Sequence, residues 1–293
     1  MYKFQPILKT LVWGTESWVL SGVPGSESVV SEGPCKGKSI NDIYPGQFPL
    51  LIKFIDAHDD LSIQVHPDDE VAQKRHGCKG KTEMWYVIGT RPGAHLLSGM
   101  KSEIDPERYV QLVEGGKIVD ALASYDVEPG DVFFLPAGRV HAIGGGCYIA
   151  EIQQTSDITY RIYDYDRKGL DGKPRELHTE QAKDVIDYSV LPDYRTHYER
   201  CSDKEVSLVK CPFFHTGLLE LTQPFERALD SNAEFLVLVC MGGSAVVSLG
   251  AGASGAESLQ ISEGETILIP SSDADTVMIT PEGSVKLMTT YTP

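Results

Sequence analysis

The segment "GDVFFLPAGRVH", residues 130–141, contains the pattern that decides the fold. Residues 131–138 are mostly apolar and are bounded by the turn-forming residues Gly130 and Gly138, which predicts a strand between two turns. Pro136 follows Gly130 after five intervening residues, and His141 lies five positions beyond Pro136. The segment therefore predicts a strand, a tight turn and a histidine placed directly after them.

Further runs with the period of a β-strand surround this segment on both sides. They are "LLIKFIDA" (50–57), "LSIQVHP" (61–67), "TEMWYVIG" (82–89) and "YIAEIQQTS" (148–156). Helical patterns are few: one covers 105–127, with Asp105 as N-cap and Pro106 at the first helical position. The other covers 178–188, with Thr179 as a possible cap. The fold class predicted is mainly β with short helical insertions.

The second half of the chain repeats this organisation. "GETILIPSSDAD" (264–275) has the same glycine and proline spacing as 130–141, with Asp275 where the first copy has His141. Likewise "EFLVLVC" (234–240) resembles "EMWYVIG" (83–89). We therefore expect two β domains, a metal-binding catalytic domain at 1–190 and a degenerate, metal-free domain at 191–293.

Composition limits the kinds of partner that the protein can have. The chain has 293 residues, 41% hydrophobic content and a net charge of −16, which argues against nucleic acid as a partner. We find neither an apolar run of membrane-spanning length nor a signal-peptide pattern, and no membrane partner is expected. The six cysteines are scattered without a C-x-x-C pair. We expect a cytoplasmic protein with reduced thiols, either a monomer or a homodimer.

Four polar side chains stand out within the apolar strands. Gln64 and His66 lie on one face of their strand, Glu83 lies on the face of Trp85, and His141 follows the opening segment. Any one of them, taken alone, is better explained as a hydrogen-bonded core residue. Together they form a nitrogen and oxygen donor set that suits a divalent cation, with Zn²⁺ as the first choice.

The fixed positions of 130–141 fit the second motif of the cupin barrel, G-x5-P-x-G-x2-H, whereas Q-V-H at 64–66 departs from that family's usual H-x-H. With this departure, the chain closely resembles the short form of the type I mannose-6-phosphate isomerases, members of the cupin superfamily. The motifs that carry the resemblance are "VWGTESW" (12–18), "QVHPDD" (64–69), "GKTEMWYV" (80–87), "GDVFFLPAGRVHAI" (130–143) and "EIQQTSDITYRIYDYDR" (151–167).

The resemblance implies two cupin-type (jelly-roll) β-barrels and one Zn²⁺ per chain. It also implies that Gln64, His66, Glu83 and His141 bind the metal and that Lys81, Glu151 and Arg161 line the active site. The reaction implied is the interconversion of mannose 6-phosphate and fructose 6-phosphate, so the partner is a small sugar phosphate. The chain is too short for the helical domain of the larger family members.

The reaction needs a group that carries a proton between C2 and C1 of the sugar through an enediolate. Either Glu151 could serve, if burial raises its pKa, or Lys81, if the nearby cation lowers its pKa. The sequence does not choose between them, although Lys81 is slightly favoured. Arg161 could hold the enediolate or the phosphate, unless it pairs with Asp164 or Asp166, and Arg139 is a weaker phosphate candidate.

Other functions remain open at this level. Two histidines and a carboxylate are also the ligands of non-haem iron oxygenases, although a fourth ligand such as Gln64 argues against open coordination positions. A cupin that binds a sugar phosphate without catalysis is a second alternative. A storage-type β protein is disfavoured because we find no secretion signal.

Overall fold

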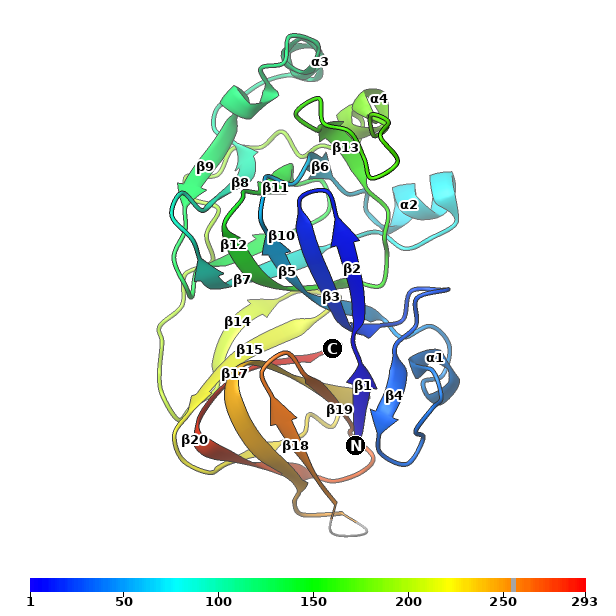
Figure 1. Cartoon of the computed structure of the whole chain (residues 1–293), viewed down its shortest axis with the longest axis vertical. Coiled ribbons are helices and arrows are strands. Elements are labelled where there is room, and N and C mark those ends of the chain that lie inside the picture. Colours follow the sequence, from blue (N-terminus) through cyan, green and yellow to red (C-terminus); the bar gives the residue numbers. More distant parts are fainter. Residues whose placement is uncertain (254–256) are drawn as a thin grey trace. The chain divides into compact units, whose positions relative to one another are not determined.

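The structure is a computed structural model that describes residues 1–253 and 257–293, and the chain divides into two compact units (Figure 1). The central unit comprises Leu8–Ser17 and Leu51–Thr196. The terminal unit comprises Met1–Ile7, Trp18–Leu50 and His197–Pro293. Strands dominate both units and the helices are short, which confirms the predicted class of two cupin-type β-barrels with short helical insertions.

Two sheets largely build the central unit, with strand orders β10-β7-β12-β5-β3-β2 and β13-β6-β11-β8-β9. The strands of the first sheet are β2 (Ile7–Leu11), β3 (Gly14–Ser21), β5 (Leu50–Ala57), β7 (Glu83–Thr90), β10 (Val132–Leu135) and β12 (Cys147–Gln154). Those of the second are β6 (Ile63–Val65), β8 (His95–Met100), β9 (Leu122–Asp126), β11 (His141–Ile143) and β13 (Tyr160–Tyr163). All five runs that predicted strands in this part of the chain contain one.

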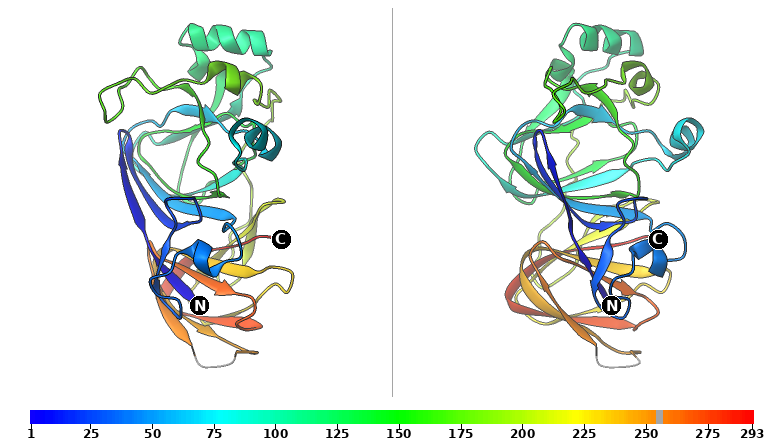
Figure 2. Two further views of the ribbon diagram at one scale, coloured as in Figure 1. Left: turned by 90° about the vertical axis from the view of Figure 1, so that its right-hand side faces the viewer. Right: turned by 45° about the vertical axis from the view of Figure 1, so that its right-hand side comes forward.

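The core of the central unit lies between its two sheets. Trp85 and Val87 of β7 and Phe133 of β10 share one buried cluster with Leu96 of β8 and Ile143 of β11. A second cluster lies on the opposite face of the five-stranded sheet and joins strand residues to residues of α3 and α4. Figures 1 and 2 show these two helices beside the sheet. Because side chains alternate along a strand, residues that share a face with Trp85 point into the space between the sheets.

The helices are α1 (Ile40–Ile43), α2 (Asp69–His76), α3 (Pro106–Glu114) and α4 (Thr179–Lys183), with a 3₁₀ turn η1 (Ile118–Ala121). The Asp105 side chain accepts a 2.7 Å hydrogen bond from the Arg108 amide, as expected of the N-cap of α3. The prediction of a helix over 105–127 was too long, because the glycines at 115 and 116 end α3 and β9 follows. Thr179 is the first residue of α4 and not its cap.

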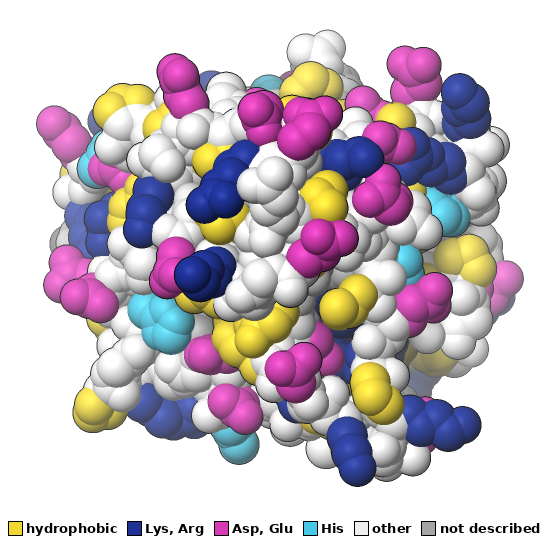
Figure 3. All heavy atoms as spheres, turned by 90° about the horizontal axis from the view of Figure 1, so that it is seen from above, with side chains coloured by type: hydrophobic (Ala, Val, Ile, Leu, Met, Phe, Trp, Pro, Cys, Tyr) yellow, Lys and Arg dark blue, Asp and Glu magenta, His cyan; other side chains and the backbone are white. Residues whose placement is uncertain are grey.

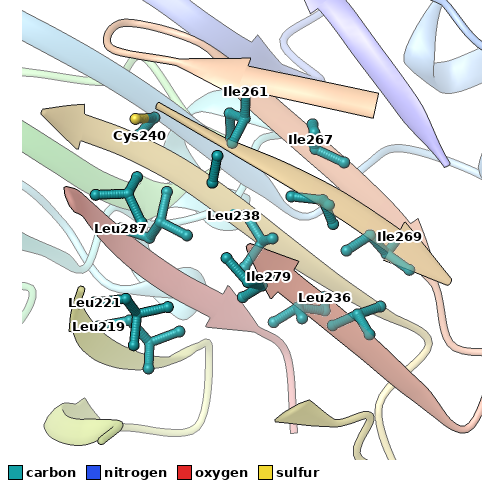
Figure 4. Close-up of a cluster of buried hydrophobic side chains, with 14 of the residues drawn as sticks. Leu219, Leu221, Leu236, Leu238, Cys240, Ile261, Ile267, Ile269, Ile279 and Leu287 are labelled. Atoms are coloured by element: carbon teal, nitrogen blue, oxygen red, sulfur yellow. The ribbon is translucent and has the colours of Figure 1, made fainter. Parts of the chain in front are cut away.

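The terminal unit contains a nine-stranded sheet whose main path is β14-β15-β20-β17-β19-β1-β4, with β16 paired to β20 and β18 to β17. Its strands are β1 (Tyr2–Gln5), β4 (Val29–Glu32), β14 (Val206–Lys210), β15 (His215–Leu221), β16 (Phe225–Ala228), β17 (Phe235–Leu249), β18 (Ser258–Ser262), β19 (Thr266–Pro270) and β20 (Thr276–Tyr291). Aliphatic side chains from β15, β17, β19 and β20 converge in one core (Figure 4).

The sequence repeat corresponds to a repeated pair of strands. In the central unit β10 lies antiparallel to β7, with Leu135 opposite Glu83. In the terminal unit β19 lies antiparallel to β17, with Ile269 opposite Leu236. The two segments that resemble each other in sequence therefore form equivalent neighbours within each unit.

The units differ from the expected division at residue 190. The C-terminal boundary, between Thr196 and His197, lies close to it, but residues 1–7 and 18–50 belong to the terminal unit. The reason is strand pairing across the whole chain: Tyr2 lies opposite Leu268, so β1 adds to β19. No local feature of residues 1–50 indicates this partner.

The surface carries both signs of charge. Figure 3 shows Lys and Arg side chains interspersed with Asp and Glu on the face that it displays, without a uniformly basic area. Within the described residues, no helix combines the length and apolar character that would let it cross a bilayer.

Candidate metal centre

Three strands bring the candidate ligands together between the two sheets of the central unit. Gln64 of β6 lies directly opposite His141 of β11, and His66 follows one residue after β6. Glu83 is the first residue of β7, on the face of Trp85, and is fully buried. The Gln64 side of its strand is thus an interior face and not the solvent-exposed face of a sheet.

The ligand atoms of His66, Glu83 and His141 all lie within 4.8 Å of one another. Glu83 Oε1 is 3.2 Å from His141 Nε2, and Glu83 Oε2 is 3.5 Å from His66 Nε2. The Gln64 amide nitrogen is 3.3 Å from His141 Nε2. The structure therefore brings all four candidate ligands to one point.

Backbone hydrogen bonds fix the tautomer of each histidine. His66 Nδ1 donates to the Ile158 carbonyl and His141 Nδ1 to the Arg139 carbonyl, each at 2.8 Å. Burial, reinforced by the Lys81 ammonium, lowers the pKa of His66 well below its ordinary value and that of His141 to about 3. Both rings are therefore neutral, and each Nε2 presents a lone pair to the cluster.

Glu83 Oε1 is a buried acceptor for which the described residues supply no donor. Lys81 Nζ donates to Glu83 Oε2 and lies 2.9 Å from His66 Nε2. It therefore supplies a donor to Oε2 and not to Oε1. The nearest ring nitrogen to Oε1 is the unprotonated Nε2 of His141. Burial raises the pKa of Glu83 to about 7, so this site holds the negative charge of Glu83 poorly without a further cation. A buried carboxyl oxygen beside an imidazole nitrogen that carries a lone pair is an arrangement that a cation stabilises.

A second carboxylate, Glu151 of β12, lies beside the cluster and is held by two donors. Lys53 Nζ is 2.9 Å from its Oε1, and Trp85 Nε1 donates to its Oε2 at 2.8 Å. Burial acts to raise the pKa of Glu151, but the Lys53 and Lys81 ammonium groups outweigh it and lower that pKa to about 2. Glu151 is therefore a carboxylate, contrary to the condition on which we considered it as the base.

Comparison with known proteins assigns the family. The family described as "Phosphomannose isomerase type I, catalytic domain" matches residues 7–87. The mannose-6-phosphate isomerase ManA of Bacillus subtilis is 34% identical over 297 residues, which cover 91% of this chain and 92% of that protein. The mannose-6-phosphate isomerase of Streptococcus mutans is 33% identical, covering 87% and 82%. The chain belongs to the type I mannose-6-phosphate isomerase family.

Solved structures agree with this assignment. The crystal structure of the mannose 6-phosphate isomerase from Bacillus subtilis matches with a TM-score of 0.88 and 27% identity, covering 99% of this chain and 98% of that one. A variant of the Salmonella typhimurium phosphomannose isomerase matches with a TM-score of 0.74 and 16% identity, which shows a shared fold. Membership in the mannose-6-phosphate isomerase family favours neither an oxygenase nor a protein that only binds sugar phosphates.

Arg161 and Arg139, the two arginines predicted to bind the substrate in this family member, have different surroundings. Arg161 of β13 lies opposite Gln64 and therefore on the same face, half-buried, with Nη1 donating to the Glu176 carbonyl at 3.0 Å. Its Nε is buried and has no acceptor among the described residues. Arg139 instead stacks on the Tyr194 ring, with its guanidinium 4.4 Å from the ring centroid.

The possible ion pair of Arg161 with Asp164 does not form. Asp164 is bound by Arg167 and Arg175, and Arg167 Nε donates to its Oδ1 at 2.9 Å. Burial lowers the pKa of Arg161, and the neighbouring Arg175 lowers it further. A half-buried guanidinium next to a second cation favours an anionic ligand in this mannose-6-phosphate isomerase family member.

Lys53 of β5 was not predicted as a residue of the site. This side chain is buried and lies 2.9 Å from Glu151 and 3.7 Å from Glu16. The available signal was a single lysine inside the apolar run 50–57, on the inward face shared with Ile55. Burial alone would lower the pKa of Lys53, but Glu151 and Glu16 more than reverse that effect and raise it.

Proposed function

We propose that the chain interconverts mannose 6-phosphate and fructose 6-phosphate at a metal centre formed by Gln64, His66, Glu83 and His141. The observation that carries this proposal is the Glu83 Oε1 atom, a buried acceptor that lies beside an imidazole lone pair and lacks a donor in the described chain. Membership in the type I family supports the reaction.

We propose one Zn²⁺ per chain as the cation. Two imidazole nitrogens, a carboxylate and an amide oxygen form a donor set that zinc accepts, and none of the four is a thiolate. Turning the Gln64 amide by a half rotation presents its oxygen in place of its nitrogen. Bound there, the cation would polarise the sugar carbonyl and stabilise the negative charge that develops on the substrate oxygens.

The proton carrier in our proposal is Lys81. Its Nζ is buried and lies within hydrogen-bonding distance of two ligands, next to the place where a bound sugar would react. As a neutral amine it would take the proton from C2, and the ammonium so formed would return it to C1. Glu151 is less suitable, because a carboxylate with a pKa of about 2 accepts a proton weakly at neutral pH. We assign Glu151 the role of holding Lys53 and Trp85 in place.

Arg161 is the substrate-binding residue that we carry forward, together with Lys81. Its inward face and its unpaired Nε fit a guanidinium that holds the phosphate or the enediolate. Arg139 is not carried forward, because its guanidinium is stacked on Tyr194. A reducing location such as the cytoplasm belongs to the proposal as well, supported by six free cysteines.

The function is tested with mannose 6-phosphate and a coupled assay for fructose 6-phosphate. We expect turnover by the purified protein, and binding without turnover would contradict the proposal.

The role of Lys81 is tested by following exchange of the C2 proton of mannose 6-phosphate with solvent deuterium by NMR. We expect Lys81→Met to lose both isomerisation and exchange, because the proton carrier is removed, whereas Glu151→Gln should keep measurable exchange. Metal content is measured in the same samples as a control. Normal exchange by Lys81→Met with its metal retained would exclude Lys81 as the carrier.

A further inference from the structure

The terminal unit contains a polar cavity that is separate in sequence from every residue of the metal centre. Its volume is about 180 Å³, and residues from β14, β15, β16 and β20 line it. Glu205, Lys210, His215, Arg227 and Tyr291 are among them.

This cavity continues the interior face of the terminal sheet. His215 and Gly217 precede Leu219 on β15 at alternate positions, and Tyr291 lies opposite His215 on β20. Leu219 belongs to the aliphatic core that Figure 4 shows. The interior-facing side of these strands thus changes from aliphatic to polar towards one end, a place where barrel folds commonly hold ligands.

Gly217 keeps the cavity open. A Cβ at this position would lie 2.7 Å from Thr289 Oγ1 and 2.8 Å from Glu205 Oε1. Any side chain at Gly217 would therefore displace these two groups or fill the space between them.

The acidic side chain in the cavity is already fully engaged. Arg227 Nε lies 3.1 Å from both carboxylate oxygens of Glu205, and Thr289 Oγ1 donates to the same carboxylate at 2.6 Å. Glu205 therefore offers little to a ligand, and it fixes the guanidinium of Arg227, which is 9% exposed.

Lys210 and Arg227 supply the cationic groups of the lining. Arg227 Nη1 donates to the Ala228 carbonyl at 3.0 Å, and no acceptor for Nη2 or for the exposed Lys210 side chain is found among the described residues. His215 Nδ1 lies 3.2 Å from the Tyr291 hydroxyl, which also has Asp230 beside it. Within the lining itself Glu205 and Arg227 offset each other, and Lys210 adds one positive charge.

We propose that this cavity is a second ligand site, one that binds a small oxyanion, and that its ligand is a phosphate group. Lys210 and Arg227 are hydrogen-bond donors, and the Glu205 carboxylate already accepts from Arg227 and Thr289, so the lining favours a ligand rich in acceptor oxygens. The planar guanidinium of Arg227 matches the geometry of a phosphate group. A cavity of about 180 Å³ has room for a phosphate group. The site uses no residue of the metal centre, so it does not depend on the proposed function.

The test is a calorimetric titration of the full chain with inorganic phosphate after chelator treatment. We expect saturable binding that Lys210→Met and Arg227→Met each weaken by about tenfold, since each removes a charge-assisted hydrogen bond. Lys204→Met, an exposed lysine outside the lining, is the matched control and should bind as the unaltered chain does. Parallel titrations with mannose 6-phosphate and mannose distinguish free phosphate from the phosphate of a sugar, and mannose should not bind here.

Circular dichroism establishes that each variant is folded, and Lys210→Met decides the outcome alone if Arg227→Met does not fold. Absence of saturable phosphate binding would overturn the proposal. The proposal would also be overturned if folded Lys210→Met and Arg227→Met bound phosphate as tightly as Lys204→Met does.

Discussion

Lys53 shows how single residues organise the interior of the central unit. Its ammonium joins the carboxylates of Glu151 and Glu16 in a place that excludes water. A buried charge is tolerated only with partners, so the removal of one member leaves the others uncompensated. Glu151 in turn receives a hydrogen bond from Trp85, which lies between Glu83 and Val87 on the inward face of β7.

We therefore expect Lys53→Met to lower the free energy of unfolding by about 3–5 kcal/mol, because two carboxylates lose their shared cation. Urea denaturation of chelator-treated protein measures this change. Lys117→Met, at an exposed lysine of the same unit, is the control and should change little. A loss for Lys53→Met no greater than that of the control would show that the ion pair is unimportant.

The candidate ligands themselves were predictable from the sequence at the residue scale. Gln64, His66, Glu83 and His141 are polar groups on inward faces of apolar strands, and the family motifs select the same four. Lys53 was not singled out, because one lysine in an apolar strand also fits a strand edge. The low pKa of Glu151 could not be predicted either, since it depends on Lys53, which lies far away in sequence.

Individual strands and helices were predicted correctly where the local sequence pattern was strong. Alternating apolar runs predicted the strands of the central unit, and the Asp-Pro pair at 105–106 predicted the start of α3. The helix α2 was missed because it has no apolar face: Ala72 is its one buried residue. Its start depends on Asp68, whose side chain accepts a 2.9 Å hydrogen bond from the Val71 amide.

The cap of α3 gives a prediction for this scale. Asp105→Ala should destabilise the chain by about 1 kcal/mol, because the Arg108 amide loses its acceptor. Asp105→Ser keeps a capping oxygen and should retain most of the stability. Urea denaturation of both variants is the measurement, and equal stability of the two would contradict the capping role.

In the whole molecule, neither compact unit is one continuous stretch of the sequence. The expected boundary at 190 rested on where apolar runs resume, whereas the units meet between Thr196 and His197 and also divide residues 1–50 between them. The grouping of β1 with the terminal unit depends on pairing between Tyr2 and Leu268, which no local pattern reveals. Long-range strand pairing is thus the part of this fold that the sequence left undetermined.

Removal of residues 1–7 should therefore destabilise the terminal unit, although these residues begin the chain. β19 would keep its pairing with β17 but lose its other partner, β1, and the buried side chains of Met1 and Phe4 would be removed. We expect a melting temperature lower by several degrees, measured by calorimetry, whereas removal of the C-terminal residues 292–293 should have little effect. Equal melting temperatures would contradict the assignment of β1 to this unit.

In our proposal Gln64, His66, Glu83 and His141 hold one cation, and catalysis depends on it. The most direct test of this proposal is zinc content per chain and isomerase activity measured on the same sample, before chelation, after chelation and after zinc is restored, for the unaltered chain and for His141→Ala. We expect the activity of the unaltered chain to rise and fall with its zinc content, up to one zinc per chain, and we expect His141→Ala to recover neither zinc nor activity. Full activity in the zinc-free, unaltered chain would contradict the proposal.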